Sequence, residues 1–199
     1  VPPHFLFTAL NPIVALIRPR PAEAEEVTEE LADLFRYVLR ASRQPTVSLA
    51  EELKSVEMYL AIEKARFGDR LKPRLDIPPA LHGARVPSLI LQPLVENAVK
   101  HGASRVEGEC AIEVEGRQEG DRICLRVSDG GPGFASILPE AVFGSGTGLA
   151  NVRDRLHLHF GTGASVQLRP DGVELVFPRL NGPVPAPPAV VGPWTQPAG

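Results

Sequence analysis

The sequence is poor in the features that mark several large classes of protein. Its 199 residues include only two cysteines, one methionine and one tryptophan. Cys110 and Cys124 lack the spacing of metal ligands and lie in strand-like patterns, so we expect both to be reduced and buried in a core. No run of about 18 apolar residues occurs, which excludes a membrane-spanning helix within this sequence.

An excess of charge of one sign is also missing. The 21 Lys and Arg residues nearly balance the 24 Asp and Glu residues, and the net charge is −3. This balance gives no electrostatic reason to expect a nucleic acid or an anionic membrane as a partner. With 43% hydrophobic residues the chain can bury a sizeable core, which fits one domain and a smaller helical unit.

The segment Leu91–Gly102 combines an apolar stripe with an unusual polar face. Apolar residues recur there at the spacing of one face of an α-helix, and they are Leu91, Leu94, Val95, Ala98 and Val99. The opposite face carries Glu96, Asn97, Lys100 and His101, and Gly102 ends the predicted helix. Taken alone, the segment is more simply interpreted as an ordinary amphipathic helix with a polar outer face.

Two glycine motifs follow this helix. Val127-Ser-Asp-Gly-Gly-Pro-Gly-Phe134 places an acid at the end of an apolar strand pattern, and Gly144-Ser-Gly-Thr-Gly-Leu-Ala-Asn151 leads into a helical pattern. The second cluster lacks the Gly-Lys-Ser/Thr ending of a P-loop and the spacing of a dinucleotide fingerprint, so both of those sites are excluded.

In this order the three motifs resemble the N, G1 and G2 boxes of the GHKL ATP-binding superfamily, which includes histidine kinases, gyrase, Hsp90 and MutL. The resemblance implies ATP and Mg²⁺ as cofactors. It implies that Asp129 accepts a hydrogen bond from the adenine amino group, with Gly131 and Gly133 turning the backbone beneath the base, and that Asn97 is the metal ligand. The chain departs from the family at Gly130, where Asn is usual.

The same resemblance implies a set of residues around the phosphates. The amides of the second glycine cluster and the N-terminal end of the following helix would bind phosphate oxygens, with Lys100 adding charge and Arg153 as a weaker candidate. The implied nucleotide contacts of this set are Lys100, His101, Gly144, Gly146, Thr147, Gly148 and Leu149.

The N-terminal segment supplies a second resemblance. Pro3-His4-Phe5-Leu6-Phe7 resembles the Pro-His-Phe-Leu-Phe-Asn signature of LytS-type sensor histidine kinases, which implies that His4 is the phosphoacceptor. Thr8 stands where that family has Asn. A helical stripe is expected here from Leu6, Leu10, Ile13 and Ile17, and Pro12 should kink or end the helix.

Two further helices are predicted before the central segment. Residues 22–40 form an amphipathic pattern with acids early and arginines late, and a capping box over Ser48–Glu51 opens a third helix. The first two helices should form a hairpin, and pairing two hairpins as a four-helix bundle would give a homodimer. The segment Tyr59–Phe67 again resembles the LytS-type family and should join the hairpin to the ATP-binding domain.

The rest of the pattern predicts an α+β fold. A short strand over 73–77, a hairpin of 111–115 and 123–128 with its turn at 116–121, a helix over 151–160 and a last hairpin of 165–168 and 173–177 suit a mixed sheet covered by helices. We expect a helical dimerisation and phosphotransfer region over 1–68, a GHKL (Bergerat) α/β sandwich over 69–180 and a Pro-rich disordered tail over 181–199.

The function implied is that of a sensor histidine kinase that autophosphorylates His4 with Mg-ATP and passes the phosphoryl group to a response regulator receiver domain. Glu96 would be the general base. A nucleotide-binding signalling module without phosphotransfer is the alternative, and a plain ATPase of the gyrase or Hsp90 kind is a third. Because the chain opens on Val1-Pro2, we expect a cytoplasmic fragment of a membrane-anchored bacterial sensor, without its upstream sensory region.

Overall fold

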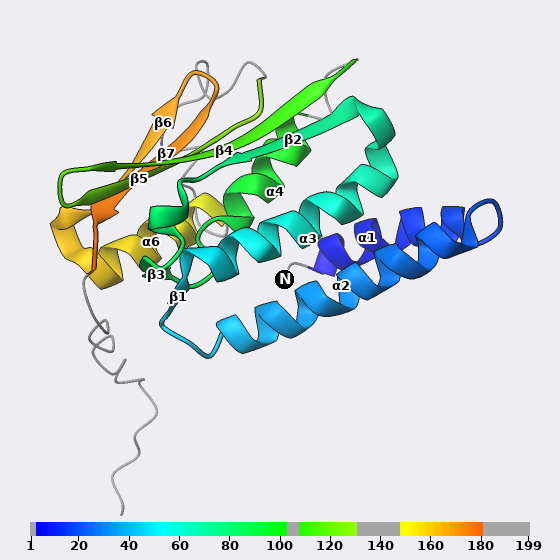
Figure 1. Cartoon of the computed structure of the whole chain (residues 1–199), viewed down its shortest axis with the longest axis horizontal. Coiled ribbons are helices and arrows are strands. Elements are labelled where there is room, and N and C mark those ends of the chain that lie inside the picture. The colour runs from blue at the N-terminus through cyan, green and yellow to red at the C-terminus, as the bar shows by residue number, and fades with distance from the viewer. Residues whose placement is uncertain (1–2, 103–107, 131–147, 181–199) are drawn as a thin grey trace, which may run out of the picture.

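The computed structural model describes residues 3–102, 108–130 and 148–180, with side chains from Leu10 onward in the first helix. Five α-helices, three short 3-10 helices and two sheets make up this part of the chain (Figure 1). The helices are α1 (Pro3–Leu16), α2 (Pro21–Ala41), α3 (Leu49–Phe67), α4 (Gln92–His101) and α6 (Gly148–Phe160). The strands are β1 (Thr46–Ser48), β2 (Leu71–Asp76), β3 (Arg85–Pro87), β4 (Cys110–Glu119), β5 (Arg122–Ser128), β6 (Ser165–Arg169) and β7 (Gly172–Pro178).

The larger sheet is mixed, as the sequence predicts. Its five strands run in the order β2-β4-β5-β7-β6, and β2 is parallel to β4 while the other pairs are antiparallel. Strands β1 and β3 form a separate two-stranded ribbon. Helices α3, α4 and α6 lie on one face of the five-stranded sheet (Figure 1). The fold is therefore an α/β sandwich preceded by a helical hairpin.

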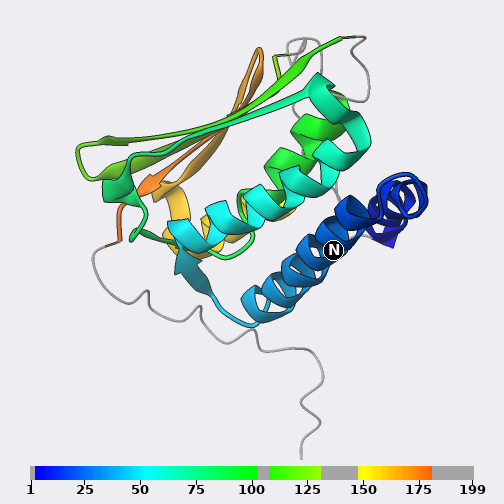
Figure 2. The same cartoon turned by 45° about the vertical axis from the view of Figure 1, so that its right-hand side comes forward.

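Helix α3 separates the α1–α2 hairpin from the sheet (Figure 2). Its predicted stripe, Leu49, Leu53, Val56 and Leu60, is buried. A second set on the same helix is buried as well: Glu52, Ser55, Met58, Tyr59, Ile62 and Glu63. Since α3 packs on both sides, it is the element that joins the hairpin to the sandwich.

The start of α3 is the predicted capping box. The backbone N–H of Glu51 donates to Ser48 Oγ at 3.2 Å, and the backbone N–H of Ser48 donates to Glu51 Oε2 at 2.9 Å. Both bonds satisfy donors that would otherwise be unpaired at the helix entrance.

Helix α1 and the β4–β5 hairpin differ in detail from the sequence predictions. Helix α1 does not end at Pro12 but continues to Leu16, and its buried residues are Ile13 and Leu16. Leu10 and Ile17, which the sequence pattern assigned to the stripe, are 44% and 54% exposed. These values describe a single chain, whereas the predicted four-helix bundle would cover the stripe with a second hairpin.

The second correction concerns the β4–β5 hairpin, in which the predicted turn at 116–121 is too long. Strand β4 continues to Glu119, and only Gly120 and Asp121 lie between the strands. Gly116 pairs with Leu125 inside the ladder, where a Cβ would lie 2.5 Å from Ile77 Cδ1. This glycine thus marks a close contact within a strand, whereas the sequence prediction took it as the start of a turn.

Two other expectations concern cysteines and membrane spans. Cys110 and Cys124 are free and buried, as the sequence predicts. Among the helices that the structure describes, none is long and apolar enough to cross a membrane.

Candidate functional site

Helix α4 presents its polar edge beside a buried apolar face. Leu94, Val95 and Val99 are at most 2% exposed and anchor the helix in the core. Glu96 and Asn97 are half-buried on the other side. Of the two predicted residues in its last turn, Lys100 is exposed and His101 is half-buried.

The end of α4 meets the residue that follows β5. Asp129 is 9% exposed, and its backbone N–H donates to the carbonyl oxygen of Asp171 at 3.2 Å. A Cβ on Gly102 would lie 2.8 Å from Cys110 Sγ and 3.0 Å from Asp129 Cβ. A side chain at residue 102 would therefore have to displace Cys110, Asp129 or the end of α4, so the glycine that closes the first motif permits the close approach of α4 to the end of β5.

The start of α6 meets the opposite end of α4. A Cβ on Gly148 would lie 3.1 Å from Pro93 Cβ and 3.9 Å from Asn97 Nδ2. The last glycine of the third motif thus lies against the Asn of the first. Leu149, the next residue, is 3% exposed and packs in the core.

Three motifs from distant parts of the sequence thus meet around α4. Asp129 lies at its C-terminal end, and Gly148 lies beside Pro93 in its first turn and Asn97 in its middle. The first backbone N–H groups of α6 have no intrahelical partner and give that helix end a partial positive charge. An acidic acceptor, an amide oxygen and a helix N-terminus together can bind a base, a hard cation and phosphate oxygens.

Several predicted site residues fall outside the described part of the chain. They are Gly131, Gly133, Gly144, Gly146 and Thr147. The backbone of His4 lies in α1, while its side chain is outside the description. The sequence predictions for these residues stay predictions.

Glu96 has the electrostatic environment of a proton acceptor. Gln92 Nε2 donates to Glu96 Oε1 at 3.0 Å, and the side chain is half-buried. Burial raises the pKa of Glu96, the hydrogen bond from Gln92 opposes this shift, and the nearby Glu63 carboxylate adds to it. A carboxylate with a raised pKa is a stronger base than an exposed one.

Sequence reasoning missed two buried carboxylates on α3. Glu52 and Glu63 are 0% and 4% exposed. A signal for Glu52 was present, because it lies three residues after Leu49 and four before Val56 and so falls on the apolar stripe of the helix. An acid at such a position must find buried partners.

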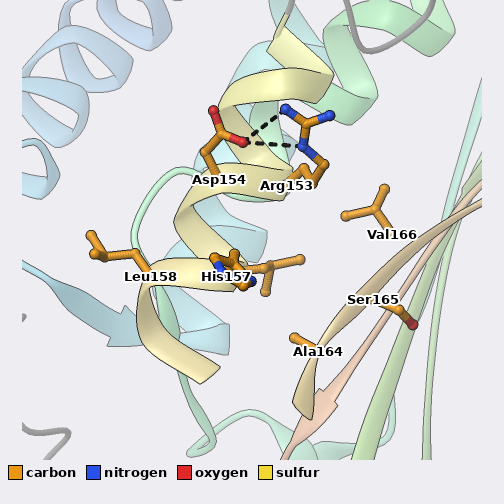
Figure 3. A pocket seen from close by; sticks show the side chains of 8 residues that line it. Arg153, Asp154, His157, Leu158, Ala164, Ser165 and Val166 are labelled. Atoms are coloured by element: carbon orange, nitrogen blue, oxygen red, sulfur yellow. Dashed lines mark hydrogen bonds and ion pairs between the residues drawn. The ribbon is translucent and has the colours of Figure 1, made fainter. Parts of the chain in front are cut away.

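A pocket of about 370 Å³ lies between α6 and the start of β6. Figure 3 shows Arg153 and Asp154 of α6 at its edge, where they form an ion pair at 3.0 Å, and Ser165 and Val166 of β6 across from the helix. None of the pocket's lining residues belongs to the cluster around Asn97 and Asp129. Arg153, the weaker phosphate candidate, therefore lines a different hollow.

Two family models match the chain. A model of histidine kinases matches residues 1–71, and a model of histidine kinase-, DNA gyrase B- and HSP90-like ATPases matches residues 84–181. The second match spans α4, the β4–β5 hairpin and α6, which are the elements that form the cluster.

Individual proteins with similar sequences include sensor kinases. Sensor histidine kinase BtsS of Escherichia coli (strain K12) is 38% identical over 182 residues, which is 90% of this chain and 32% of that protein. Sensor protein LytS of Bacillus subtilis (strain 168) is 33% identical over 188 residues, or 89% of this chain and 32% of that protein. The chain thus spans about a third of the length of these curated relatives.

Solved structures give the same fold. The catalytic domain of histidine kinase ThkA matches with a TM-score of 0.51 at 19% identity, covering 67% of this chain and 95% of that one. Mycobacterial sensor histidine kinase MprB matches with a TM-score of 0.51 at 21% identity, covering 67% of this chain and 97% of that one. At these identities the likeness concerns the architecture alone.

Proposed function

Because the chain belongs to the sensor histidine kinases of the LytS type, we propose that it binds Mg-ATP and transfers the γ-phosphoryl group to His4. From there the group passes to an aspartate of a response regulator receiver domain. The observation that carries the proposal is the meeting of Asn97, Asp129 and Gly148 around α4. We also propose that the chain acts in the cytoplasm as part of a membrane-anchored sensor.

The first step is binding of the nucleotide. Asp129, buried at the end of β5, accepts a hydrogen bond from the exocyclic amino group of adenine. The N-terminal end of α6 binds phosphate oxygens through its unpaired backbone N–H groups, and Lys100 adds a positive charge from the exposed side of α4. These contacts orient the γ-phosphate toward the hairpin that carries His4.

Asn97 is the residue that suits a magnesium ion. Its amide oxygen is a hard, neutral ligand, and the missing side chain at Gly148 leaves space beside it. When bound, the ion would neutralise charge that develops on the phosphates. Asn97 itself holds that position because Leu94 and Ala98 bury the opposite face of α4.

Phosphoryl transfer needs a nucleophilic ring nitrogen and a leaving group. A bond forms between a nitrogen of His4 and the γ-phosphorus, the bond from that phosphorus to the β–γ bridging oxygen breaks, and ADP leaves. Glu96, half-buried with a raised pKa, receives the ring proton that His4 loses. Most of the rate enhancement comes from positioning and charge neutralisation.

The proposal divides the chain into two working parts and a tail. Residues 1–68 form the helical dimerisation and phosphotransfer region and residues 69–180 the ATP-binding domain, while 181–199 lie outside the described chain. Exposed apolar side chains on the hairpin support a homodimer, namely Leu10, Val14, Ile17 and Leu39. Burying these against a second copy would remove an apolar surface from water.

The proposal is tested with γ-labelled ATP and Mg²⁺. Acid-labile label on the unmodified chain should vanish in His4→Gln and in Asn97→Ala, whereas His82→Gln, which changes an exposed histidine, should keep it. Nucleotide binding, measured separately, should survive in His4→Gln. Label that persists in His4→Gln would contradict the acceptor, and binding without any label on the unmodified chain would favour a nucleotide-binding module.

A further inference from the structure

Glu52 is a carboxylate in the middle of the molecule without a cationic partner in the described chain. Its side chain is fully buried in α3, with 0% exposed. It accepts four hydrogen bonds: from the Tyr37 hydroxyl at 2.5 Å and from the backbone N–H groups of Leu89, Ile90 and Leu91 at 2.7, 3.0 and 3.1 Å. A buried carboxylate with so many donors is costly to build and holds its neighbours in place.

Three of these donors belong to the turn that leads into α4. Leu91 is the N-cap residue of α4, and its carbonyl oxygen accepts the first helical bonds, from the N–H groups of Leu94 and Val95. Glu52 therefore satisfies N–H groups at the entrance of α4, as an N-cap side chain would, but from another helix. Its negative charge also complements the positive end of the α4 dipole.

The same turn is held in an unusual backbone conformation. Leu89 has a φ of 57° in the left-handed region, where a branched side chain is strained. The hydrogen bond from its N–H to Glu52 Oε1 offsets that strain. The conformation of this turn therefore depends on where Glu52 lies.

The second helix of the nucleotide site is attached to the turn as well. Arg155 of α6 donates from Nη1 to the carbonyl oxygen of Ser88 at 2.7 Å. Ser88 Oγ in turn donates to the carbonyl oxygen of Gln44, in the connection between α2 and β1. Residues 88–91 thus link α4 and α6 to the helical region.

The fourth donor to Glu52 comes from the hairpin. Tyr37 lies on α2, is 7% exposed, and shares Glu52 Oε1 with the N–H of Leu89. Burial raises the pKa of Tyr37, and the adjacent Glu52 carboxylate raises it further, so the hydroxyl keeps its proton and remains a donor. One carboxylate thus joins α2, α3 and the start of α4.

We propose that Glu52 is a positioning residue through which the helical hairpin sets the place of α4 and hence of Asn97 and Glu96. The inference rests on the proposed kinase function for its activity readout. A shift of α2 moves the Tyr37 hydroxyl, and the carboxylate passes that shift to the turn at 88–91. By thermodynamic reciprocity, nucleotide bound at α4 must also change the stability of α2.

Two substitutions separate the contact between Tyr37 and Glu52 from the contacts between Glu52 and the turn at 88–91. Tyr37→Phe removes only the hydroxyl, so Glu52 still holds α4; nucleotide affinity should stay within about twofold while the saturated rate of His4 phosphorylation falls about tenfold. Glu52→Gln loses acceptors for backbone N–H groups, so affinity and rate should both fall. Thr28→Ala, which removes another α2 hydroxyl that donates to the carbonyl oxygen of Ala24 in its own helix, is the matched control and should change neither.

Backbone hydrogen exchange gives a readout that needs no phosphoryl transfer. In the unmodified chain, Mg²⁺ with a non-hydrolysable ATP analogue should slow exchange in α2 around Tyr37, and in Tyr37→Phe this slowing should disappear. If the chain binds nucleotide but is not phosphorylated, the proposed kinase activity is refuted, and the hydrogen-exchange measurement alone decides the inference about Glu52. Unchanged rate and unchanged nucleotide-dependent exchange in Tyr37→Phe would overturn the inference, even if Glu52→Gln failed to fold.

Discussion

The α-carbon of Gly102 lies so close to Asp129 that a Cβ at residue 102 would be 3.0 Å from the Cβ of the acid. The same atom would be 2.8 Å from the carbonyl oxygen of Ala98. The end of α4 and the end of β5 therefore meet without room for a methyl group. This contact sets the distance between the residue proposed to bind adenine and the helix proposed to bind the metal.

Gly102→Ala should weaken both the fold and nucleotide binding. The added methyl group must displace α4 or Asp129, and overpacking of this kind costs about 1–3 kcal/mol. Chemical denaturation would measure the loss of unfolding free energy, and titration with a fluorescent nucleotide would measure affinity. Gly83→Ala is the control, because a Cβ there meets nothing within 4 Å. Equal affinity in both variants would contradict the proposed place of adenine.

Local patterns predicted the elements around the site well. The apolar stripe of Leu91–Val99 and the following glycine defined α4 to within a residue, because spacing and capping act over short distances. The meeting of Gly102 with Asp129 follows only from the resemblance of the three motifs to a known family. Spacing alone does not bring residues 27 positions apart into contact.

The hydrogen bonds of Glu52 could not be predicted in the same way. Its partners among residues 89–91 offer backbone N–H groups, which every residue type except proline carries. Its position on an apolar stripe predicted burial and nothing about the partners. The pattern likewise places Leu10 and Ile17 on an apolar stripe of α1 but does not say which element covers them.

Ser48→Ala should destabilise the domain by about 1 kcal/mol. The substitution removes the hydroxyl that accepts from the N–H of Glu51 and leaves that donor unpaired at the start of α3. Thermal unfolding followed by circular dichroism would measure the change. Ser42→Ala, at an exposed hydroxyl beyond the end of α2, should have a far smaller effect, and equal losses would show that capping is not the cause.

The effect of Glu63→Gln on the free energy of unfolding, relative to the unmodified chain, should become more favourable as pH rises. Burial raises the pKa of Glu63 against the opposing effect of Arg66, so the folded state binds the proton more tightly than the unfolded state does. The stability that this provides is present at low pH and is lost as pH rises through the folded pKa. Gln cannot ionise and escapes that loss.

The measurement is the difference in melting temperature between Glu63→Gln and the unmodified chain at several values from about pH 5 to pH 8. The difference should move in favour of the variant with rising pH. Glu57→Gln, at an exposed position of the same helix, supplies the comparison. A difference that stays constant, or that moves the other way, would mean that the ionised form of Glu63 is stabilised by its surroundings.

Val14→Glu should prevent the proposed homodimer from forming. Val14 is 67% exposed on α1 and lies one turn from Leu10 and near Ile17, which are also exposed. A carboxylate placed in the middle of these apolar side chains would have to lose its water without gaining a partner when a second copy docks.

Light scattering should give the mass of two chains for the unmodified protein and of one for the variant. Leu158→Glu, at an exposed leucine on α6, should remain a dimer. If the unmodified chain also has the mass of one chain at micromolar concentration, the proposed homodimer is refuted.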